Sequence, residues 1–402
     1  MDVKKIREDF PALQQKIHGK PLIYFDSSCM SLRPKQVIDA MNEYYEKFPA
    51  CAGRSIHTLS QKVDEEYRKA REVVAKFIGA KAEEIIFTRN TTEGINLIAN
   101  SLGLKSGDAV VTSDIEHNSN LLPWQMLAKK GVKHKIVFSK DMQFDESNFR
   151  KTMDSSVKLV SFVHTSNLSG YTFPAEKIAK IAHDNSSLVM FDCAQSVPHK
   201  QIDVHKLGAD FIAFSGHKML GPSGMGVLYG KKELLEEMSP FLLGGDTVAN
   251  STYETHELLK PPEKFEAGLQ NYAGAIGLAA AVKYLEKVGM KEIEKHEEEL
   301  NEIITEGISS IRGLKIIGPQ PAKLRGGIIS FNIEGLNPHD IAMMLDSTAS
   351  IAIRSGAHCV HSWFNANNLP RGSARASLYL YNTEEEAKIF IDKLREISNT
   401  LR

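Results

Sequence analysis

The middle of the chain alternates short apolar runs with amphipathic stretches, and no other feature of the sequence constrains the fold as strongly. Short, mostly apolar runs rich in β-branched and aromatic residues are typical of buried strands in a mostly parallel sheet. The runs occupy residues 84–87, 109–112, 158–163, 188–191 and 211–214. Helical patterns at 92–101 and 175–183 lie among them, so we predict an α/β fold with helices on both faces of the sheet.

A second, smaller α/β domain is predicted after residue 290, where the pattern changes. A charged amphipathic helix is expected over 291–311, a strand over 327–332, a helix from Pro338 and a closing helix over 384–401. A chain of 402 residues is also too long for one ordinary core. We place the large domain at 17–290 and the small domain at 1–16 and 291–402.

Composition and charge argue against several kinds of partner and location. With 49 Lys and Arg against 50 Asp and Glu, the chain lacks the basic excess that nucleic acid or anionic membrane would attract. Its four cysteines form no C-x-x-C pair, which indicates a reduced setting. The charged first ten residues do not resemble a signal peptide, and the apolar stretch 274–282 is too short to span a membrane. We expect a cytoplasmic protein.

Polar or ionisable residues follow each of the five predicted strands. They occupy residues 88–94, 114–118, 164–167, 192–195 and 215–218. In an open parallel sheet, ligands bind beyond the carboxyl ends of the strands, where a purely structural sheet needs only turn-forming residues. The sequence therefore predicts a ligand site at this edge.

The residue types at this edge suggest a phosphate-bearing cofactor. Thr91 and Thr92 stand just before a helical pattern, where hydroxyls and free N–H groups bind anions, and Ser215 and His217 can add donors.

Three further residues suggest what the rest of that cofactor is. Asp192 can keep a ring nitrogen protonated, His117 can stack on a flat ring or move a proton, and Lys218 can form a Schiff base. Singly, each residue has an ordinary alternative as a helix cap, a core histidine or a surface lysine. Jointly, they are the parts of a site for pyridoxal 5′-phosphate (PLP).

The glycine-rich segment 221–226 does not form a nucleotide-binding motif. Lys218 precedes these glycines, whereas in a phosphate-binding P-loop the lysine follows them, and Tyr229 stands where a dinucleotide motif requires glycine. The glycines more simply allow the backbone to pass close to a ligand or another subunit.

A second candidate site surrounds Cys359. A reactive cysteine needs cationic neighbours, which Arg354, His358 and His361 can supply; the alternative is a small buried residue in an ordinary loop. We expect no metal here, because such closely spaced residues rarely reach one ion. Arg375 is a candidate clamp for a substrate carboxylate, or else a member of a surface salt bridge.

The segment 215–224, which reads SGHKMLGPSG, resembles the cofactor-lysine motif of class V aminotransferase-type PLP enzymes. Within these it is most similar to the cysteine desulfurase and selenocysteine lyase branch with the short cysteine loop, whose catalytic loop the segment 354–359 matches. Further similar segments follow in the family's order within 91–96, 116–125, 166–167, 192–195, 265–268 and 375–383.

The resemblance implies PLP fold type I, with a large, mostly parallel seven-stranded sheet domain and a smaller α/β domain, and a homodimer with active sites at the subunit interface. It implies that Lys218 carries the cofactor, Asp192 pairs with the pyridine nitrogen and His117 stacks on the ring. The remaining implied cofactor contacts are Asn167 and Gln195 to ring substituents, and Thr91, Thr92, Ser215 and His217 to phosphate. The implied substrate contacts are Arg375, Arg354 and Asn167.

The activity implied is a PLP-dependent cysteine desulfurase. L-cysteine loses its Cα proton to Lys218, Cys359 takes the sulfur as a persulfide, and L-alanine is released. An acceptor protein then receives the sulfur, typically for iron–sulfur cluster assembly. The alternatives are a selenocysteine lyase, an epimerase or aminotransferase acting on another amino acid, and, more remotely, a non-catalytic scaffold.

Three segments depart from the family's usual sequence. Residues 27–30 read Ser-Ser-Cys-Met, where small residues such as alanine are usual, and 53–55 read Gly-Arg-Ser instead of His-Arg-Gly. Tyr272 replaces a threonine that, in the family, reaches the phosphate of the neighbouring subunit. These segments border the substrate in the family, so they bear on which amino acid is used. The sequence assigns no role to Cys29 or Cys51.

Overall fold

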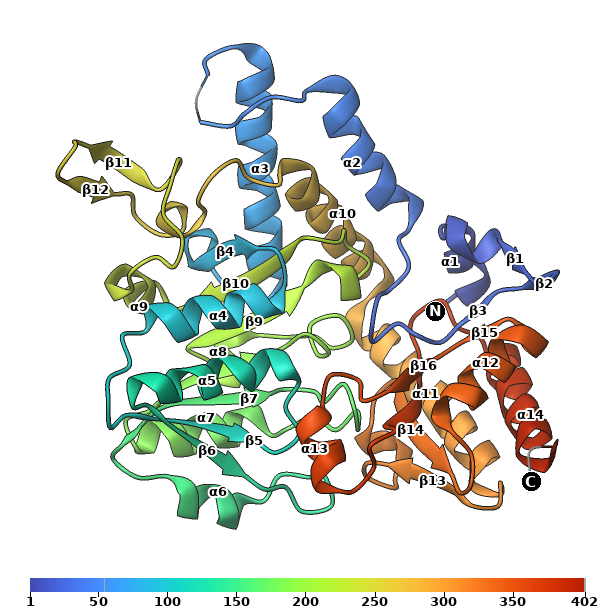
Figure 1. The fold of residues 1–402 in the computed structure, drawn as a ribbon. Helices are drawn as coiled ribbons and strands as arrows, with labels where there is room; N and C mark the ends of the chain where they lie inside the picture. Colours follow the sequence, from blue (N-terminus) through green and yellow to red (C-terminus); the bar gives the residue numbers. More distant parts are fainter. Residues whose placement is uncertain (54, 401–402) are drawn as a thin grey trace.

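The computed structural model describes residues 1–53 and 55–400, so Arg54 of the departing segment 53–55 lies outside the described residues. Its centre is a seven-stranded sheet in the order β4-β10-β9-β8-β7-β5-β6 (Figure 1). The strands are β4 (Ile85–Thr88), β5 (Ala109–Ser113), β6 (Lys133–Val137), β7 (Val157–Val163), β8 (Leu188–Asp192), β9 (Phe211–Ser215) and β10 (Gly226–Gly230). β10 runs antiparallel to both neighbours, and the remaining pairs are parallel. The predicted mostly parallel seven-stranded sheet is confirmed.

Alternate residues of these strands face two separate apolar cores, as the pleat of a strand requires. In β5, Val110 packs into a core with Trp124, whereas Val111 packs into the other core with Phe162. The helices that follow the sheet strands are α4 (Thr91–Ser101), α5 (Leu122–Leu127), α6 (Glu146–Thr152), α7 (Ala175–Asp184), α8 (Val204–Leu207) and α9 (Lys232–Glu237). Helices therefore cover both faces of the sheet, as predicted.

Three long helices pack together beside β4, at the edge of the sheet (Figure 1). They are α2 (Lys35–Lys47), α3 (Thr58–Phe77) and α10 (Tyr272–Val288). A hairpin of β11 (Val248–Ser251) and β12 (His256–Leu258) projects from the same end of the molecule. Tyr272 is buried at the start of α10, with its ring 5.2 Å from that of Tyr67.

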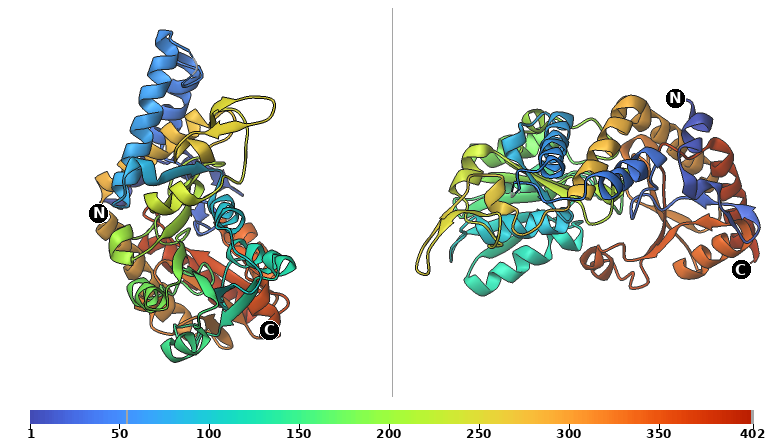
Figure 2. Two further views of the ribbon diagram at one scale, coloured as in Figure 1. Left: turned by 90° about the vertical axis from the view of Figure 1, so that its left-hand side faces the viewer. Right: turned by 90° about the horizontal axis from the view of Figure 1, so that it is seen from above.

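The C-terminal part forms a second layered unit of sheet and helices beside the seven-stranded sheet and its helices (Figure 2). A four-stranded antiparallel sheet has the order β13-β14-β17-β16. Its strands are β13 (Leu314–Ile317), β14 (Ile328–Ile333), β16 (Arg354–Gly356) and β17 (Ser373–Ser377). The helices of this part are α11 (Met290–Ser309), α12 (Pro338–Ala349), α13 (His361–Ala366) and α14 (Glu384–Thr400). The helices predicted at 291–311, from Pro338 and at 384–401 are confirmed.

The N-terminal segment contributes to both cores. Phe10, just after α1 (Val3–Glu8), packs into a core of the large sheet. β3 (Ile23–Tyr24) pairs in parallel with β15 (Ile351–Ala352), and Ile23 and Phe25 enter the core of the small sheet. The remaining short strands are β1 (Lys16–Ile17) and β2 (Lys20–Pro21). The division at residues 16 and 290 stays a prediction.

The turn after β7 joins the two parts next to the strand ends. The Ser330 hydroxyl, on β14, donates to the carbonyl of Leu168 at 2.6 Å. Gly170 has a φ of 72°, and a Cβ there would lie 2.0 Å from the carbonyl oxygen of Arg325, so only glycine allows this approach. The small sheet is thereby held against the carboxyl ends of the large sheet.

Across residues 1–53 and 55–400, no helix combines the length and apolarity that a bilayer crossing requires.

Candidate active site

A cavity of about 250 Å³ lies between the carboxyl ends of the large sheet and the strands β16 and β17. All twelve residues predicted to take part in catalysis, cofactor binding or substrate binding line it, whereas His361 does not. The twelve are Thr91, Thr92, His117, Asn167, Asp192, Gln195, Ser215, His217, Lys218, Arg354, Cys359 and Arg375. The edge of the sheet therefore brings the predicted residues together, as the strand-end argument requires.

Lys218 and Asp192 bring an amine and a carboxylate into this cavity. Lys218 lies in the short turn after β9, and Asp192 ends the adjacent strand β8, where its Oδ1 accepts from the N–H of Ala194 at 2.9 Å. Burial lowers the pKa of the Lys218 amine, and the charge of Asp192 partly offsets that effect. Burial likewise raises the pKa of Asp192 against the charge of Lys218. A desolvated amine with a lowered pKa is a better nucleophile than an ordinary lysine.

His117 is held as a neutral ring. Its Nδ1 accepts a hydrogen bond from the N–H of Ser119 at 3.1 Å, so the proton of the neutral ring resides on Nε2. Burial, with smaller contributions from Lys218 and Arg375, lowers the pKa of His117 to about 3. A neutral imidazole can lie against an aromatic ring and exchange a proton at Nε2.

A cluster of hydroxyls surrounds the N-terminus of α4. The hydroxyls of Thr91 and Ser215 are 2.7 Å apart, and those of Thr92 and Ser119 are 2.6 Å apart. Burial lowers the pKa of the nearby His217 to about 4, which leaves it neutral. Free N–H groups at a helix N-terminus, together with such hydroxyls, form a site for a phosphate group.

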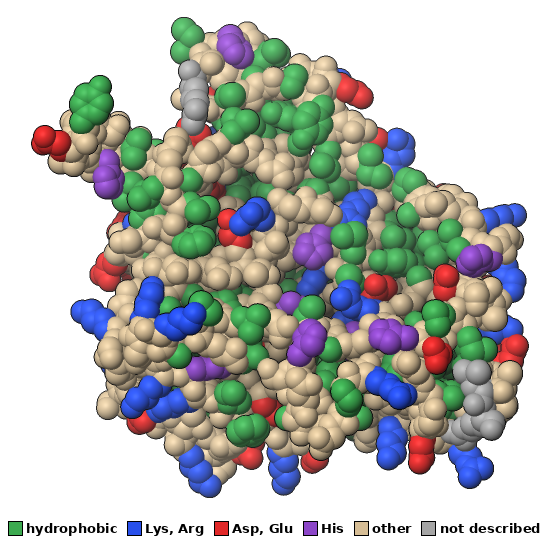
Figure 3. Space-filling view, in the orientation of Figure 1, with side chains coloured by type: hydrophobic (Ala, Val, Ile, Leu, Met, Phe, Trp, Pro, Cys, Tyr) green, Lys and Arg blue, Asp and Glu red, His purple; other side chains and the backbone are tan. Residues whose placement is uncertain are grey.

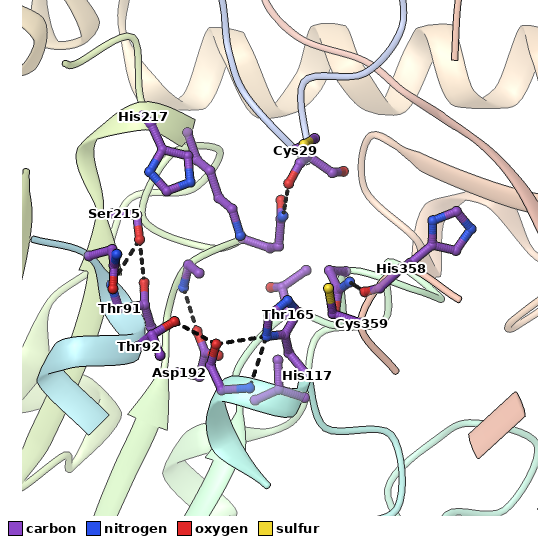
Figure 4. Close-up of a pocket in the computed structure, with 18 of the residues that line it drawn as sticks. Cys29, Thr91, Thr92, His117, Thr165, Asp192, Ser215, His217, His358 and Cys359 are labelled. Carbon is purple, nitrogen blue, oxygen red and sulfur yellow. Dashed lines mark hydrogen bonds between the residues drawn. The ribbon is translucent and has the colours of Figure 1, made fainter. Parts of the chain in front are cut away.

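Several buried polar atoms around the cavity have no partner within the protein. They include Asn167 Oδ1, Gln195 Oε1 and Arg375 Nε. Native proteins rarely leave buried polar atoms unpaired, so these atoms mark where a bound molecule supplies partners. The amine, the carboxylate, the anion-binding hydroxyls and these unpaired atoms together fit PLP. Figure 4 shows Asp192 and the hydroxyls of Thr91 and Ser215 at this cavity. Among the described residues, no group of histidine, cysteine and carboxylate side chains is arranged to hold a metal ion.

Two arginines from the small sheet face the strand ends. Arg354 of β16 stands opposite Arg375 of β17. Arg375 is buried, donates to the carbonyl of Asn167 at 3.0 Å, and forms an ion pair of 3.3 Å with Asp26. Its unpaired Nε remains available for an anionic group such as a carboxylate. Arg354 instead donates to the sulfur of Cys29 at 2.6 Å.

Cys359 lies in a tight loop between β16 and α13. The backbone is left-handed at His358 and Cys359, with φ of 48° and 60°. The carbonyl of Cys359 accepts from the N–H of Asn118 at 2.7 Å, and the side-chain amide of Asn167 donates to the carbonyl of His358 at 2.8 Å. These bonds fix the loop against the ends of β5 and β7.

The cationic neighbours expected for Cys359 have other partners. Arg354 contacts Cys29, His358 bonds to the hydroxyl of Ser373, and His361 bonds to Asn118. Burial lowers the pKa of His358 to about 2, so this ring is neutral.

Sequence analysis missed several residues that line the cavity. They include Ser28, Cys29 and Ser119, while Thr165 was included only as a member of the segment 164–167, without a role. Ser119 lies one residue after the predicted strand-end segment 114–118, so extending that segment would have found it. Cys29 stood out only as an unusual residue, because its place in the cavity depends on the pairing of β3 with β15.

Glu116 was also not assigned a role, although it supports the strand end that carries His117. Its carboxyl oxygens accept from the N–H of Val163 at 2.9 Å and from the amide of Asn120 at 2.8 Å. Glu116 thus ties the segment after β5 to β7.

The fold and the cavity together define an enzyme of the PLP-dependent class with the fold type I architecture. The sequence matches the family model described as aminotransferase class-V over residues 23–390. The chain belongs to this family.

The similar proteins align with nearly the whole length of this chain. It is 42% identical to a probable cysteine desulfurase of Halalkalibacterium halodurans, covering 96% of this chain and 95% of the relative. It is 44% identical to one from Synechocystis, covering 97% and 94%. Among solved structures, a cysteine desulfurase from Thermococcus onnurineus has a TM-score of 0.94 at 41% identity, covering 98% of each chain. The cysteine desulfurase CsdA of Escherichia coli has a TM-score of 0.90 at 30% identity, covering 100% and 99%.

Proposed function

We propose that this protein is a PLP-dependent cysteine desulfurase that moves the sulfur of L-cysteine to Cys359 and releases L-alanine. The observation that carries the proposal is the presence of Lys218, Asp192 and Cys359 in one cavity. The names of the similar relatives support the same activity.

Each site residue of the large domain has a defined role in this proposal. When bound, PLP supplies an electron sink for the bonds at the substrate's Cα. Lys218 would hold the cofactor and then remove the Cα proton, and Asp192 would keep the pyridine nitrogen protonated. His117 would lie against the ring and donate a proton at Nε2. The other proposed contacts are Asn167 and Gln195 to ring substituents, and Thr91, Thr92, Ser215 and His217 to phosphate.

The small domain supplies the substrate clamp and the sulfur acceptor. The buried guanidinium of Arg375 binds the substrate carboxylate through its unpaired Nε, with Arg354 and Asn167 nearby. The Cys359 thiolate attacks the substrate sulfur, so an S–S bond forms as the C–S bond breaks. The electron pair of the broken bond stays with the three-carbon product, which takes up a proton to become alanine.

The test measures alanine and sulfide together after L-cysteine and a reductant are added to the cofactor-loaded protein. Equal amounts of both products are expected, and Cys359→Ala should abolish both while the cofactor absorbance is retained. Cys51→Ala, which alters an exposed thiol, is the matched control. Retained cofactor absorbance with neither product would reject L-cysteine and direct the assay to selenocysteine and other amino acids.

We further propose that the protein is a cytoplasmic homodimer that passes sulfur to an acceptor protein, such as one serving iron–sulfur cluster assembly. Large apolar side chains are exposed at Ile56, Leu269 and Leu243, with Ile56 94% accessible. Figure 3 shows hydrophobic side chains gathered over the upper part of one face of the molecule. A second copy of the chain that covers these side chains would remove their apolar surface from water, which is energetically favourable. Light scattering of the purified protein should give twice the mass of one chain.

A further inference from the structure

The active-site cavity contains a second thiol besides Cys359. Cys29 enters it from the segment between β3 and α2, whereas Cys359 comes from the loop after β16 (Figure 4). All four cysteines are free: Cys193 is buried, Cys51 is exposed, and the two in the cavity are partly accessible. Neither Cys51 nor Cys193 lines the cavity.

The strong cationic contact in this part of the cavity is made to Cys29. Arg354 Nη1 donates to Cys29 Sγ at 2.6 Å, which is a short distance for a contact to sulfur. The facing Arg375 is 2% exposed and has an unpaired Nε, although Asp26 pairs with its Nη2. This end of the cavity is therefore arranged for anionic groups. A guanidinium contact of this kind is typical of cysteines that react.

We propose that Cys29 is a second sulfur carrier, which receives the terminal sulfur from the persulfide of Cys359. The proposal rests on the proposed function, because Cys359 must first acquire sulfur from the substrate.

The transfer is a thiol–persulfide exchange. The Cys29 thiolate attacks the outer sulfur of the Cys359 persulfide, an S–S bond forms at Cys29, and Cys359 leaves as a thiolate. The outer sulfur keeps its proton during the step. Sulfur atoms, electrons and charge are conserved, so the step needs neither oxidant nor reductant.

The geometry of the cavity favours this exchange. A persulfide lengthens the Cys359 side chain by one S–S bond, about 2 Å, within the cavity of about 250 Å³ that Cys29 also lines. Cys29, Cys359 and Lys218 all line this one cavity, so the two thiols face a common space.

The equilibrium should also favour sulfur on Cys29. Persulfides are stronger acids than thiols, so the terminal sulfur can lose its proton on either cysteine between exchanges. On Cys29 this anion would face the guanidinium of Arg354, whereas no arginine contacts the Cys359 sulfur among the contacts described. The pairing stabilises the product of the exchange.

The experiment maps persulfides by mass spectrometry. The cofactor-loaded protein receives a limiting amount of L-cysteine without reductant, is quenched with an alkylating agent at successive times, and is digested. Persulfide should appear first on the Cys359 peptide and then on the Cys29 peptide. Cys359→Ser should remove both signals, and Cys29→Ser should retain the signal on Cys359. Arg354→Lys should lower the Cys29 share severalfold, whereas Cys51→Ser should leave the distribution unchanged.

Three outcomes would overturn the proposal, and they are distinguishable. Persulfide confined to Cys359 at all times would show that Cys29 carries no sulfur, while the proposed function stands. Persulfide on Cys29 in the Cys359→Ser variant would show direct uptake from the substrate instead of a relay. Absence of alanine and of persulfide at any cysteine would reject the proposed function, and the relay with it.

Discussion

At the residue scale, the cavity combines side chains whose protonation differs from that in water. Burial lowers the pKa of Lys218 and that of His117, the latter to about 3. The lowered pKa makes the Lys218 amine a better nucleophile than an ordinary lysine, and the neutral ring of His117 carries a proton on Nε2 that it can donate.

Replacing the reactive amine tests this assignment directly. Lys218→Ala should lower the rate of alanine formation by roughly 10²- to 10⁴-fold, because the group proposed to move the Cα proton is removed. The variant should also lose the visible absorbance of the Schiff base, although added PLP can still bind by its phosphate. Unchanged activity or an unchanged spectrum would contradict the role of Lys218.

Glu116 should make stability depend on pH. Burial raises its pKa to about 8, so the folded protein holds this proton where the unfolded chain, with a pKa near 4.5, has lost it. Its contribution to stability is complete below pH 4.5 and is lost as pH rises from 4.5 to 8, by up to about 1.4 kcal/mol per pH unit.

The measurement is the urea unfolding free energy of the wild type and of Glu116→Gln at pH 5 and pH 8. The neutral variant should lose less stability than the wild type between these two values. Parallel losses in the two proteins would show that Glu116 does not titrate in this range.

At the element scale, a buried ion pair ties α3 to β4 and to the turn before α10. Arg71 of α3 binds Glu266 through Nη1 at 2.7 Å and Nη2 at 2.8 Å, and Glu266 also accepts from the N–H of Phe87 and from Tyr67. Both charged side chains are almost fully buried. Losing one partner leaves the other charge uncompensated, which is far more costly than losing an exposed pair.

Arg71→Met should therefore reduce the free energy of unfolding by about 3–5 kcal/mol. The matched control is Arg68→Met on the same helix, which removes the exposed pair with Glu72 and should cost ~0.5 kcal/mol or less. Urea unfolding followed by circular dichroism measures both. Similar losses for the two variants would mean that the Arg71–Glu266 pair does not stabilise this edge.

At the scale of the whole molecule, buried histidines should set the acid limit of stability. Burial lowers the pKa of His164 and of His217 to about 4, of His117 to about 3, and of His358 to about 2. In the unfolded chain these histidines bind a proton near pH 6.5, whereas in the folded protein they bind one only at a lower pH. The contribution of these neutral rings to the free energy of unfolding is complete above pH 6.5, and it is lost as the pH falls toward 4 and below.

Thermal unfolding at pH 7, 6, 5 and 4.5 should show a midpoint that falls progressively below pH 6.5. His164→Phe, which replaces a buried ring outside the cavity lining, should reduce this fall. A return to the original midpoint at pH 7 shows that the acid treatment is reversible. A midpoint that stays constant down to pH 4.5 would contradict the prediction.

The sequence by itself determined the elements and the chemistry of the strand ends. Hydrophobic periodicity is local, so the strands ending at Thr88, Ser113, Val163, Asp192 and Ser215 were found within one or two residues. Because parallel strands end at one edge of a sheet, the polar residues after them had to converge, and Lys218, Asp192 and His117 do line one cavity.

Only the tertiary structure decided which partners these residues have. Arg354 is five positions from Cys359 but bonds to Cys29, 325 positions away, and Arg375 pairs with Asp26, 349 positions away. The order of the seven strands, with β10 between β4 and β9, is also not the order of the chain. Local patterns cannot specify such contacts, because they arise when distant segments bury their apolar faces together and the polar side chains then pair with whatever lies within reach.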